Sequence, residues 1–274
     1  MRLEELLRII DDPFNLEGSA PLGHSMLMAA SLGGHFKLHG ERVKSFYKYA
    51  EESIENEQFD YQIPAAVSVP LAMDNVEFED SLVRALFARQ SVRKFQLRSV
   101  AFNSLSFLLK MSAGFKNIHD TKAGRFFPSG GGIYSLRVYV DVRAVEGISP
   151  GLYCFNPYRD SLDLVNSDVT DQLRYELHNK GAEMDQIKNI PFQILISTKP
   201  SATLRKYGEH GWKIILMEMG HLAQNLWLVG LGCGLAGYPC TSLNMSVSEK
   251  FLRSSTKGEF LLYSFLFGFP HDET

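Results

Sequence analysis

The sequence contains few cysteines, and their spacing fits neither a disulfide framework nor a metal site. The 274 residues include Cys154, Cys233 and Cys240 and no Cys-x-x-Cys pair. An odd, dispersed set is typical of reduced thiols and argues against a cysteine zinc centre. Three histidines within the first 40 residues have no acidic or cysteine ligands at matching spacing. We therefore predict no metal site.

Charge and hydropathy argue against three further classes of protein. The net charge is −3 and the basic residues form no stripe, so we expect no nucleic-acid partner. No stretch of about 18 residues is uncharged and continuously apolar, so we predict no membrane span. The N-terminal stretch places Glu4, Glu5 and Arg8 among apolar residues, which is not the pattern of a secretory signal. We expect a cytoplasmic protein.

The chain divides into an N-terminal extension and one larger domain. Residues 1–75 are expected to form a helical extension, used for docking or as a cap over a dimer, and two prolines within residues 62–70 indicate a linker. Residues 78–274 show clearer periodicity. Apolar spacing predicts helices around 82–86, 105–109 and 211–229, and strands around 138–142, 192–197 and 260–267. Helices and strands mix without regular alternation, so the predicted class is α+β.

The longest predicted helix precedes a misleading glycine motif. Residues 211–229 are almost wholly apolar, which predicts a helix buried on most faces, either central or at a subunit interface. Gly232 to Gly237 then matches G-x-G-x-x-G, but a dinucleotide fingerprint needs a strand before it and a helix after it. We interpret the glycines as the turn that ends the helix.

Two segments are candidates for ligand binding. Pro128-Ser129-Gly130-Gly131-Gly132 exposes backbone N–H groups that a planar or anionic ligand can approach closely, although a simple turn explains it equally well. Arg89-Gln90-Ser91-Val92-Arg93 places a hydroxyl between two arginines, which suits a phosphate, although a solvated charged turn is the alternative.

A third segment carries candidate catalytic residues. Lys206 and Tyr207 are adjacent in a polar stretch after Pro200, which we expect to be a loop. A lysine beside a phenol suits proton transfer if burial lowers the pKa of the lysine or if the neighbouring charge lowers the pKa of the tyrosine. A surface pair without function is the alternative.

These segments occur in the order found in one family. The stretch at 89–95 resembles the opening motif of nitroreductase-like flavoproteins. The choice of a group within these flavoproteins is narrowed by Arg125, residues 128–134 and the stretch Pro150–Tyr153. Lys206 to Lys213, followed by Met217 to His221 and by Gln224-Asn225, resembles a further motif of that family. Together, over residues 78–270, they resemble the SagB-type (McbC-like) azoline oxidases.

The resemblance implies a fold, a cofactor and a site. The fold would be nitroreductase-like, with a mixed or antiparallel sheet flanked by helices around a long buried helix, in an obligate homodimer that binds FMN at the subunit interface. Arg89, Gln90, Ser91 and Arg93 would meet the FMN phosphate and the pyrimidine side of its ring. Pro128, Ser129, Gly130 and Gly131 would meet the isoalloxazine from the other subunit. Ala236 and Gly237 would offer a backbone N–H to the ring, and Lys206 and Tyr207 would be catalytic.

The resemblance also implies an activity. The enzyme would be an FMN-dependent oxidase that converts thiazoline or oxazoline rings in peptides to thiazoles or oxazoles during natural-product biosynthesis, alongside a cyclodehydratase. The alternatives are an NAD(P)H-dependent nitroreductase or flavin reductase, an oxidase of carrier-bound azolines, and a non-catalytic scaffold. Two positions depart from the pattern: no lysine or arginine follows Lys257, and His210 stands where arginine is common.

Overall fold

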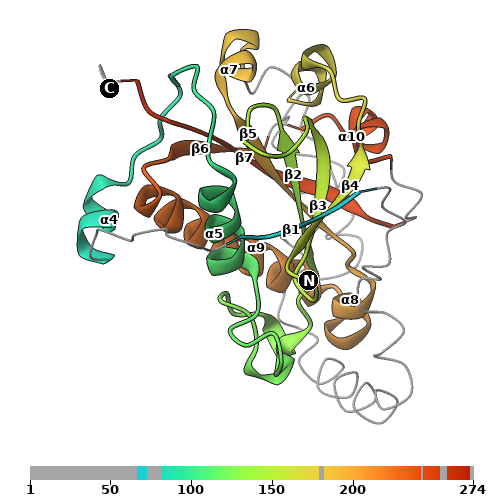
Figure 1. The fold of residues 1–274 in the computed structure, drawn as a ribbon. Coiled ribbons are helices and arrows are strands. Elements are labelled where there is room, and N and C mark those ends of the chain that lie inside the picture. The colour runs from blue at the N-terminus through green and yellow to red at the C-terminus, as the bar shows by residue number, and fades with distance from the viewer. Residues whose placement is uncertain (1–66, 73–81, 179–181, 242, 254–257, 272–274) are drawn as a thin grey trace.

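The computed structural model describes residues 67–72, 82–178, 182–241, 243–253 and 258–271 (Figure 1). The described strands form one antiparallel sheet in the order β1-β4-β3-β2-β5-β7-β6. They are β1 (Ser68–Pro70), β2 (Leu136–Val142), β3 (Gly151–Asn156), β4 (Ser161–Asn166), β5 (Phe192–Thr198), β6 (Ala236–Cys240) and β7 (Phe260–Gly268).

Helices lie on both faces of this sheet (Figure 1). They are α4 (Leu82–Ala88), α5 (Phe102–Ala113), α6 (Asp171–Leu177), α7 (Met184–Asn189), α8 (Ser201–Tyr207), α9 (His210–Gly232) and α10 (Met245–Leu252), with short 3₁₀ turns η2 (Thr121–Ala123) and η3 (Gly130–Gly132). The predicted α+β class, with an antiparallel sheet flanked by helices, is confirmed.

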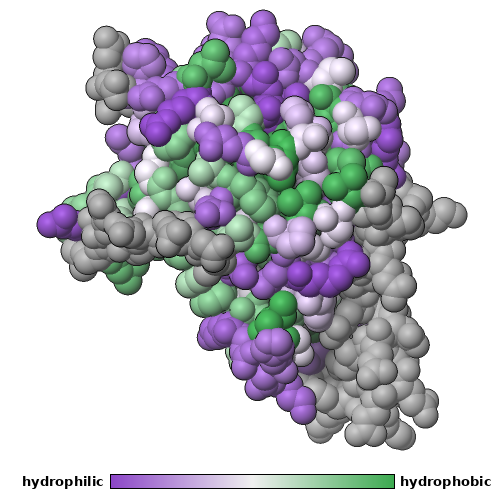
Figure 2. Space-filling model, in the orientation of Figure 1, coloured by the Kyte–Doolittle hydropathy of each residue, from purple (hydrophilic) through white to green (hydrophobic). Residues whose placement is uncertain are grey.

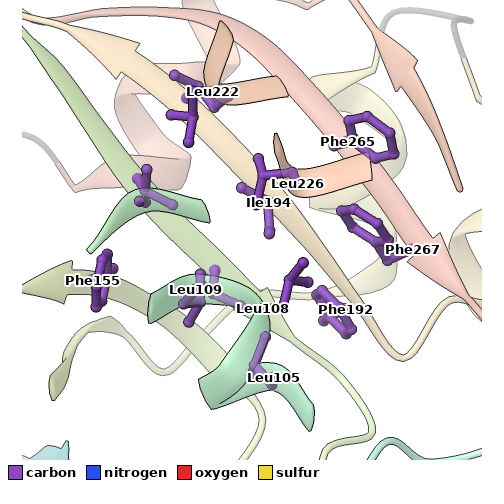
Figure 3. Close-up of a cluster of buried hydrophobic side chains, with 14 of the residues drawn as sticks. Leu105, Leu108, Leu109, Phe155, Phe192, Ile194, Leu222, Leu226, Phe265 and Phe267 are labelled. Carbon is purple, nitrogen blue, oxygen red and sulfur yellow. The ribbon is translucent and has the colours of Figure 1, made fainter. Parts of the chain in front are cut away.

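The larger core lies between the sheet and helices α5 and α9. Figure 3 shows leucines of both helices packed against side chains of β3, β5 and β7. Alternate residues of β2, such as Val138 and Val140, point into this core, as their spacing predicts for a strand. Burial of this continuous apolar surface fixes α9 against the sheet. It thereby also positions the segments that pack on α9.

The opposite face of the sheet is covered by α6 and α10 and buries charged groups as well as apolar ones. Asp141 of β2 is fully buried and accepts two hydrogen bonds from Arg174 of α6, from Nε and Nη2, each at 2.7 Å. Gln193 of β5 donates a third at 2.8 Å. A carboxylate paired in this way tolerates burial, because each oxygen has a charged or amide donor.

Helix α9 is less buried than its sequence predicts. Ile215, Met219 and Leu226 face the core, whereas Leu216 and Met217 are about half exposed. By length and composition α9 is long and apolar enough to cross a membrane, but it packs on the sheet as a core helix does. Burial of its other faces at a subunit interface stays a prediction, because the structure holds a single copy of the chain.

Two further expectations are corrected, and one lies outside the described residues. Lys206 and Tyr207 lie in helix α8 rather than in a loop, and Ser68–Pro70 forms the edge strand β1 rather than part of a linker. The sheet thus includes three residues that precede the expected boundary at residue 78. The helical extension falls largely on residues 1–66, outside the described part of the chain, so the division into 1–75 and 78–274 stays a prediction. The glycine turn after α9 is confirmed: Gly234 has φ +70° and β6 begins at Ala236.

Candidate active site

The glycine loop lies directly against the Lys206-Tyr207 pair. A Cβ atom added to Gly131 would stand 2.6 Å from Lys206 Nζ and closer still to Tyr207 Oη. Gly131 has φ +67°, a conformation that glycine adopts without strain. Lys206 is buried and Tyr207 is partly buried. The structure therefore brings together two predicted segments that are far apart in the sequence.

Side chains of helix α9 hold the glycine loop, residues 128–132, in place. A Cβ atom at Gly130 would overlap Ile214 Cγ2, so the backbone of the loop rests on the helix itself. Ser129 donates a hydrogen bond to Glu218 Oε2 at 2.5 Å, and Asn225 Nδ2 donates to the carbonyl of Phe126 at 3.1 Å. Gly131 and Gly132 are exposed and carry no side chains of their own, so a planar ligand can approach their backbone closely.

A buried arginine and a buried acid accompany the loop. The guanidinium of Arg125 lies 5.1 Å from the ring centroids of both Phe115 and Tyr134. Burial raises the pKa of Glu218 to about 7, against the opposing effects of its Ser129 hydrogen bond and the charge of Arg125. In the sequence Glu218 falls within the motif Met217–His221, but it was not predicted as a site residue. The available signal was a lone acid within the apolar stretch of a long helix.

The arginine segment and the glycine turn form a second group. Ser91 pairs with Gly237 in a parallel bridge, and the N–H of Val92 donates to the Gly237 carbonyl at 3.2 Å. A Cβ atom at Gly237 would overlap the carbonyl oxygen of Leu266, so glycine is required for this approach. The segment 89–93 thus extends the sheet edge beside Ala236 and Gly237, while Gln90 and Ser91 stay exposed.

Aromatic rings orient both arginines of the second group. The Arg89 guanidinium lies 4.5 Å from the centroid of a Trp227 ring, and that of Arg93 lies 4.9 Å from the Tyr238 ring centroid. Because α4 ends at Ala88, the two arginines follow the helix and rest on two different rings. Two cations and a hydroxyl beside exposed backbone suit an anionic group such as a phosphate.

The two groups lie at opposite ends of α9. The loop rests on Ile214, whereas Arg89 rests on Trp227, thirteen residues further along the helix. That separation is about 20 Å and about 220° of rotation in an α-helix, so the groups also face different sides. Figure 1 shows α8 and α4 at the corresponding ends of α9. One chain therefore does not bring all the predicted site residues together.

Comparison with known proteins gives the class. The sequence profile of the Nitroreductase family matches residues 86–269, about two thirds of the chain. The chain therefore belongs to this family of oxidoreductases, whose members typically bind FMN.

The chain also resembles individual members. A Methanocaldococcus jannaschii protein named "Putative nitroreductase MJ1384" is 29% identical over 163 residues, which are 60% of this chain and 77% of that protein. A crystal structure of a "putative nitroreductase" from Anabaena variabilis has a TM-score of 0.64 at 17% identity, over 75% of this chain and 42% of that one. The chain thus spans less than half of the Anabaena protein.

A third match covers more of both chains. A chain of the Escherichia coli microcin synthetase McbBCD complex with truncated pro-MccB17 bound has a TM-score of 0.59 at 19% identity, over 90% of this chain and 98% of that chain. At this identity the likeness shows a shared fold.

The residues present fit a flavin, with one group suited to its ring system and the other to its phosphate. Glycine backbone without side chains at Gly131 and Gly132 suits a flat ring system, and the cationic pair with the Ser91 hydroxyl suits a phosphate. We identify no metal-binding cluster in the described part of the chain.

Proposed function

We propose that this protein is an FMN-dependent oxidase that dehydrogenates thiazoline or oxazoline rings in peptides to thiazoles or oxazoles. The observation that carries the proposal is the packing of Lys206 Nζ and Tyr207 Oη against the backbone of Gly131. A proton acceptor beside exposed glycine backbone suits the oxidation of a planar ring. When bound, FMN would supply the two-electron acceptor.

The residues of this chain would manage the proton and the orientation of the ring. Aromatisation removes one proton from a ring carbon and a hydride equivalent from the neighbouring ring atom. Lys206 and Tyr207 together would take the proton, a role that typically contributes about 10²–10⁴-fold in rate. Gly131 would let the substrate ring approach both groups, because no side chain stands over them.

We further propose that each site is built from two copies of the chain. The loop group and the arginine group are about 20 Å apart along α9, and a homodimer would pair the loop of one copy with the arginines of the other. Exposed apolar side chains on α9 (Leu216, Met217) and on α4 (Leu86, Phe87) support such an interface. Figure 2 shows hydrophobic residues at the α4 end of the molecule.

The partners follow from the substrate. The microcin synthetase structure holds a peptide precursor within a multi-chain complex, and its likeness in fold supports a peptide substrate here. An azoline must first be formed by cyclodehydration of cysteine, serine or threonine, so we expect this chain to act alongside a cyclodehydratase.

A second candidate is an NAD(P)H-dependent nitroreductase. The observation that favours it is the 29% identity to the Methanocaldococcus protein of that name. This reaction also needs the flavin but gives no role to Lys206 and Tyr207 as proton acceptors.

Two measurements separate the candidates. Purified protein is expected to be yellow and to release FMN at about one per subunit. An azoline-containing peptide should then lose two mass units per ring oxidised, with little bleaching of the flavin by NADPH. Rapid bleaching by NADPH without any azoline turnover would identify the nitroreductase instead, and a colourless protein that refuses added FMN would contradict both.

A further inference from the structure

Glu218 is an acid placed inside the apolar side of a helix. It is 2% exposed and lies between the core residues Ile215 and Leu222 of α9. Its Oε2 accepts the hydrogen bond from Ser129, and the backbone N–H groups of Ser135 and Leu136 also donate to this carboxylate. Burying a carboxylate among apolar residues costs free energy even when it has hydrogen-bond donors, so packing alone does not account for Glu218.

The Ser129 hydroxyl, which donates a hydrogen bond to Glu218, also closes the glycine loop. Ser129 Oγ accepts the N–H of Tyr134 at 2.8 Å, and the Ser129 carbonyl accepts the N–H of Gly132 at 3.1 Å. Both ends of the 129–134 segment therefore meet at one side chain. Glu218 is the group through which that side chain is fixed to α9.

The same segment carries the contact with the Lys206-Tyr207 pair. Ile214, one helical turn before Glu218, supports Gly130, and Gly131 then lies against both α8 side chains. A loop released from Glu218 would be free to move away from α9, and the approach of Gly131 to Lys206 Nζ would change with it.

We propose that Glu218 is a positioning residue: its ionised carboxylate holds Ser129 and thereby fixes Gly131 against Lys206 and Tyr207. The inference rests on the proposed function, because that function is what makes Gly131, Lys206 and Tyr207 the site. Glu218 itself acts through the loop and touches neither substrate nor cofactor.

The charge of Glu218 changes in the physiological range. Burial raises its pKa to about 7, and Arg125, from the segment before the loop, is the charged group that opposes this rise. The backbone of Ser135 and of Leu136, at the start of β2, donates hydrogen bonds to Glu218, and neither side chain titrates. The α8 groups Lys206 and Tyr207 lie against Gly131, two residues after the serine that Glu218 holds. Protonation of Glu218 weakens the acceptor for Ser129, so the loop is held less firmly below about pH 7.

The first test follows the loop without flavin or substrate. Amide hydrogen exchange of the segment 129–134 is compared at pH 8 in the wild type, Glu218→Gln and the exposed control Glu249→Gln. Loss of a hydrogen bond to a charged group predicts about tenfold faster exchange in Glu218→Gln alone. Ser129→Ala should match it, whereas Ser129→Thr, which keeps a hydroxyl, should exchange as the wild type does.

The second test uses turnover and its pH profile. The wild type should lose kcat below about pH 7, whereas Glu218→Gln should show a lower kcat at pH 8 and no such decline near pH 7. Exchange and pH profile unchanged in Glu218→Gln would overturn the inference. If Glu218→Gln does not fold, unchanged exchange in Ser129→Ala overturns it equally. Faster exchange without turnover of any azoline peptide would leave the loop contact standing and reject the proposed reaction.

Discussion

Gly131 and Lys206 lie so close that no side chain fits between them. A Cβ atom at Gly131 would stand 2.6 Å from Lys206 Nζ, nearer than real Cβ atoms approach a neighbour. Glycine at this position therefore does more than permit a turn, because it lets the backbone approach the side-chain nitrogen of Lys206. The neighbouring Gly132 has a similar φ of +70° but no atom within 4 Å of its added Cβ.

This difference between the two glycines gives a matched pair of variants. Gly131→Ala and Gly132→Ala both force alanine into a left-handed conformation and should each lower the free energy of unfolding by about 1 kcal/mol. Only Gly131→Ala also displaces Lys206, so it alone should reduce turnover, by about tenfold or more. Thermal unfolding and steady-state turnover measure the two effects. Equal turnover in the two variants would show that the contact with Lys206 does not matter.

Removal of the proposed proton acceptors should separate chemistry from cofactor binding. Lys206→Ala and Tyr207→Phe should each lower kcat by about 10²–10⁴-fold while the visible absorption of bound FMN is retained. Lys250→Ala, at an exposed position on α10, serves as the control and should keep wild-type turnover. Full azoline turnover in both site variants would reject the catalytic assignment.

The two-copy site predicts complementation between two inactive proteins. Arg89→Ala damages the arginine group and Lys206→Ala damages the loop group, so each homodimer should be inactive. A mixed dimer would hold one site with both lesions and one site with neither. Equal mixing with subunit exchange should therefore restore about one quarter of wild-type turnover. Sites contained within single chains would give no recovery, since every site would carry one lesion.

The buried pair of Asp141 and Arg174 should dominate the stability of the second face of the sheet. Asp141→Asn or Arg174→Met leaves a buried polar group without its partner and should cost about 3–5 kcal/mol. The partly exposed pair of Lys110 and Asp160, 2.9 Å apart, should contribute much less, and replacing Lys110 with alanine should cost about 0–1 kcal/mol. Urea unfolding at pH 7 measures both. A similar cost for the two pairs would contradict the role given to burial.

Glu218 should make stability depend on pH. Its folded pKa of about 7 lies above the ordinary value of 4.5. The folded protein therefore binds more protons between these values, and stability falls as pH rises from about 4.5 to about 7. The difference between wild type and Glu218→Gln in free energy of unfolding should change by about 3 kcal/mol over that range. If the difference in free energy of unfolding between the two proteins did not change with pH, burial would not raise the pKa of Glu218.

Local patterns predicted the long elements and missed the short ones. Helix α9 and strands β2, β5 and β7 are long enough for their apolar spacing to be distinctive. Helix α8 has seven residues and is stabilised by packing on α9, so the polar stretch around Lys206 looked like a loop. Strand β1 has three residues, one of them a proline, and its partner Ser161–Asp163 lies far along the chain.

For the site, the sequence by itself determined which chemical groups are present. Consecutive glycines, a Lys-Tyr pair and two arginines around a serine are visible because their chemistry is local to each segment. Only the tertiary structure decided that Gly131 meets Lys206, that Ser91 meets Gly237, and that Glu218 holds the loop through Ser129. It also separated the two groups along α9. These relationships arise where α5 and α9 bury their apolar faces on the sheet, and that burial acts between residues regardless of their spacing in the chain.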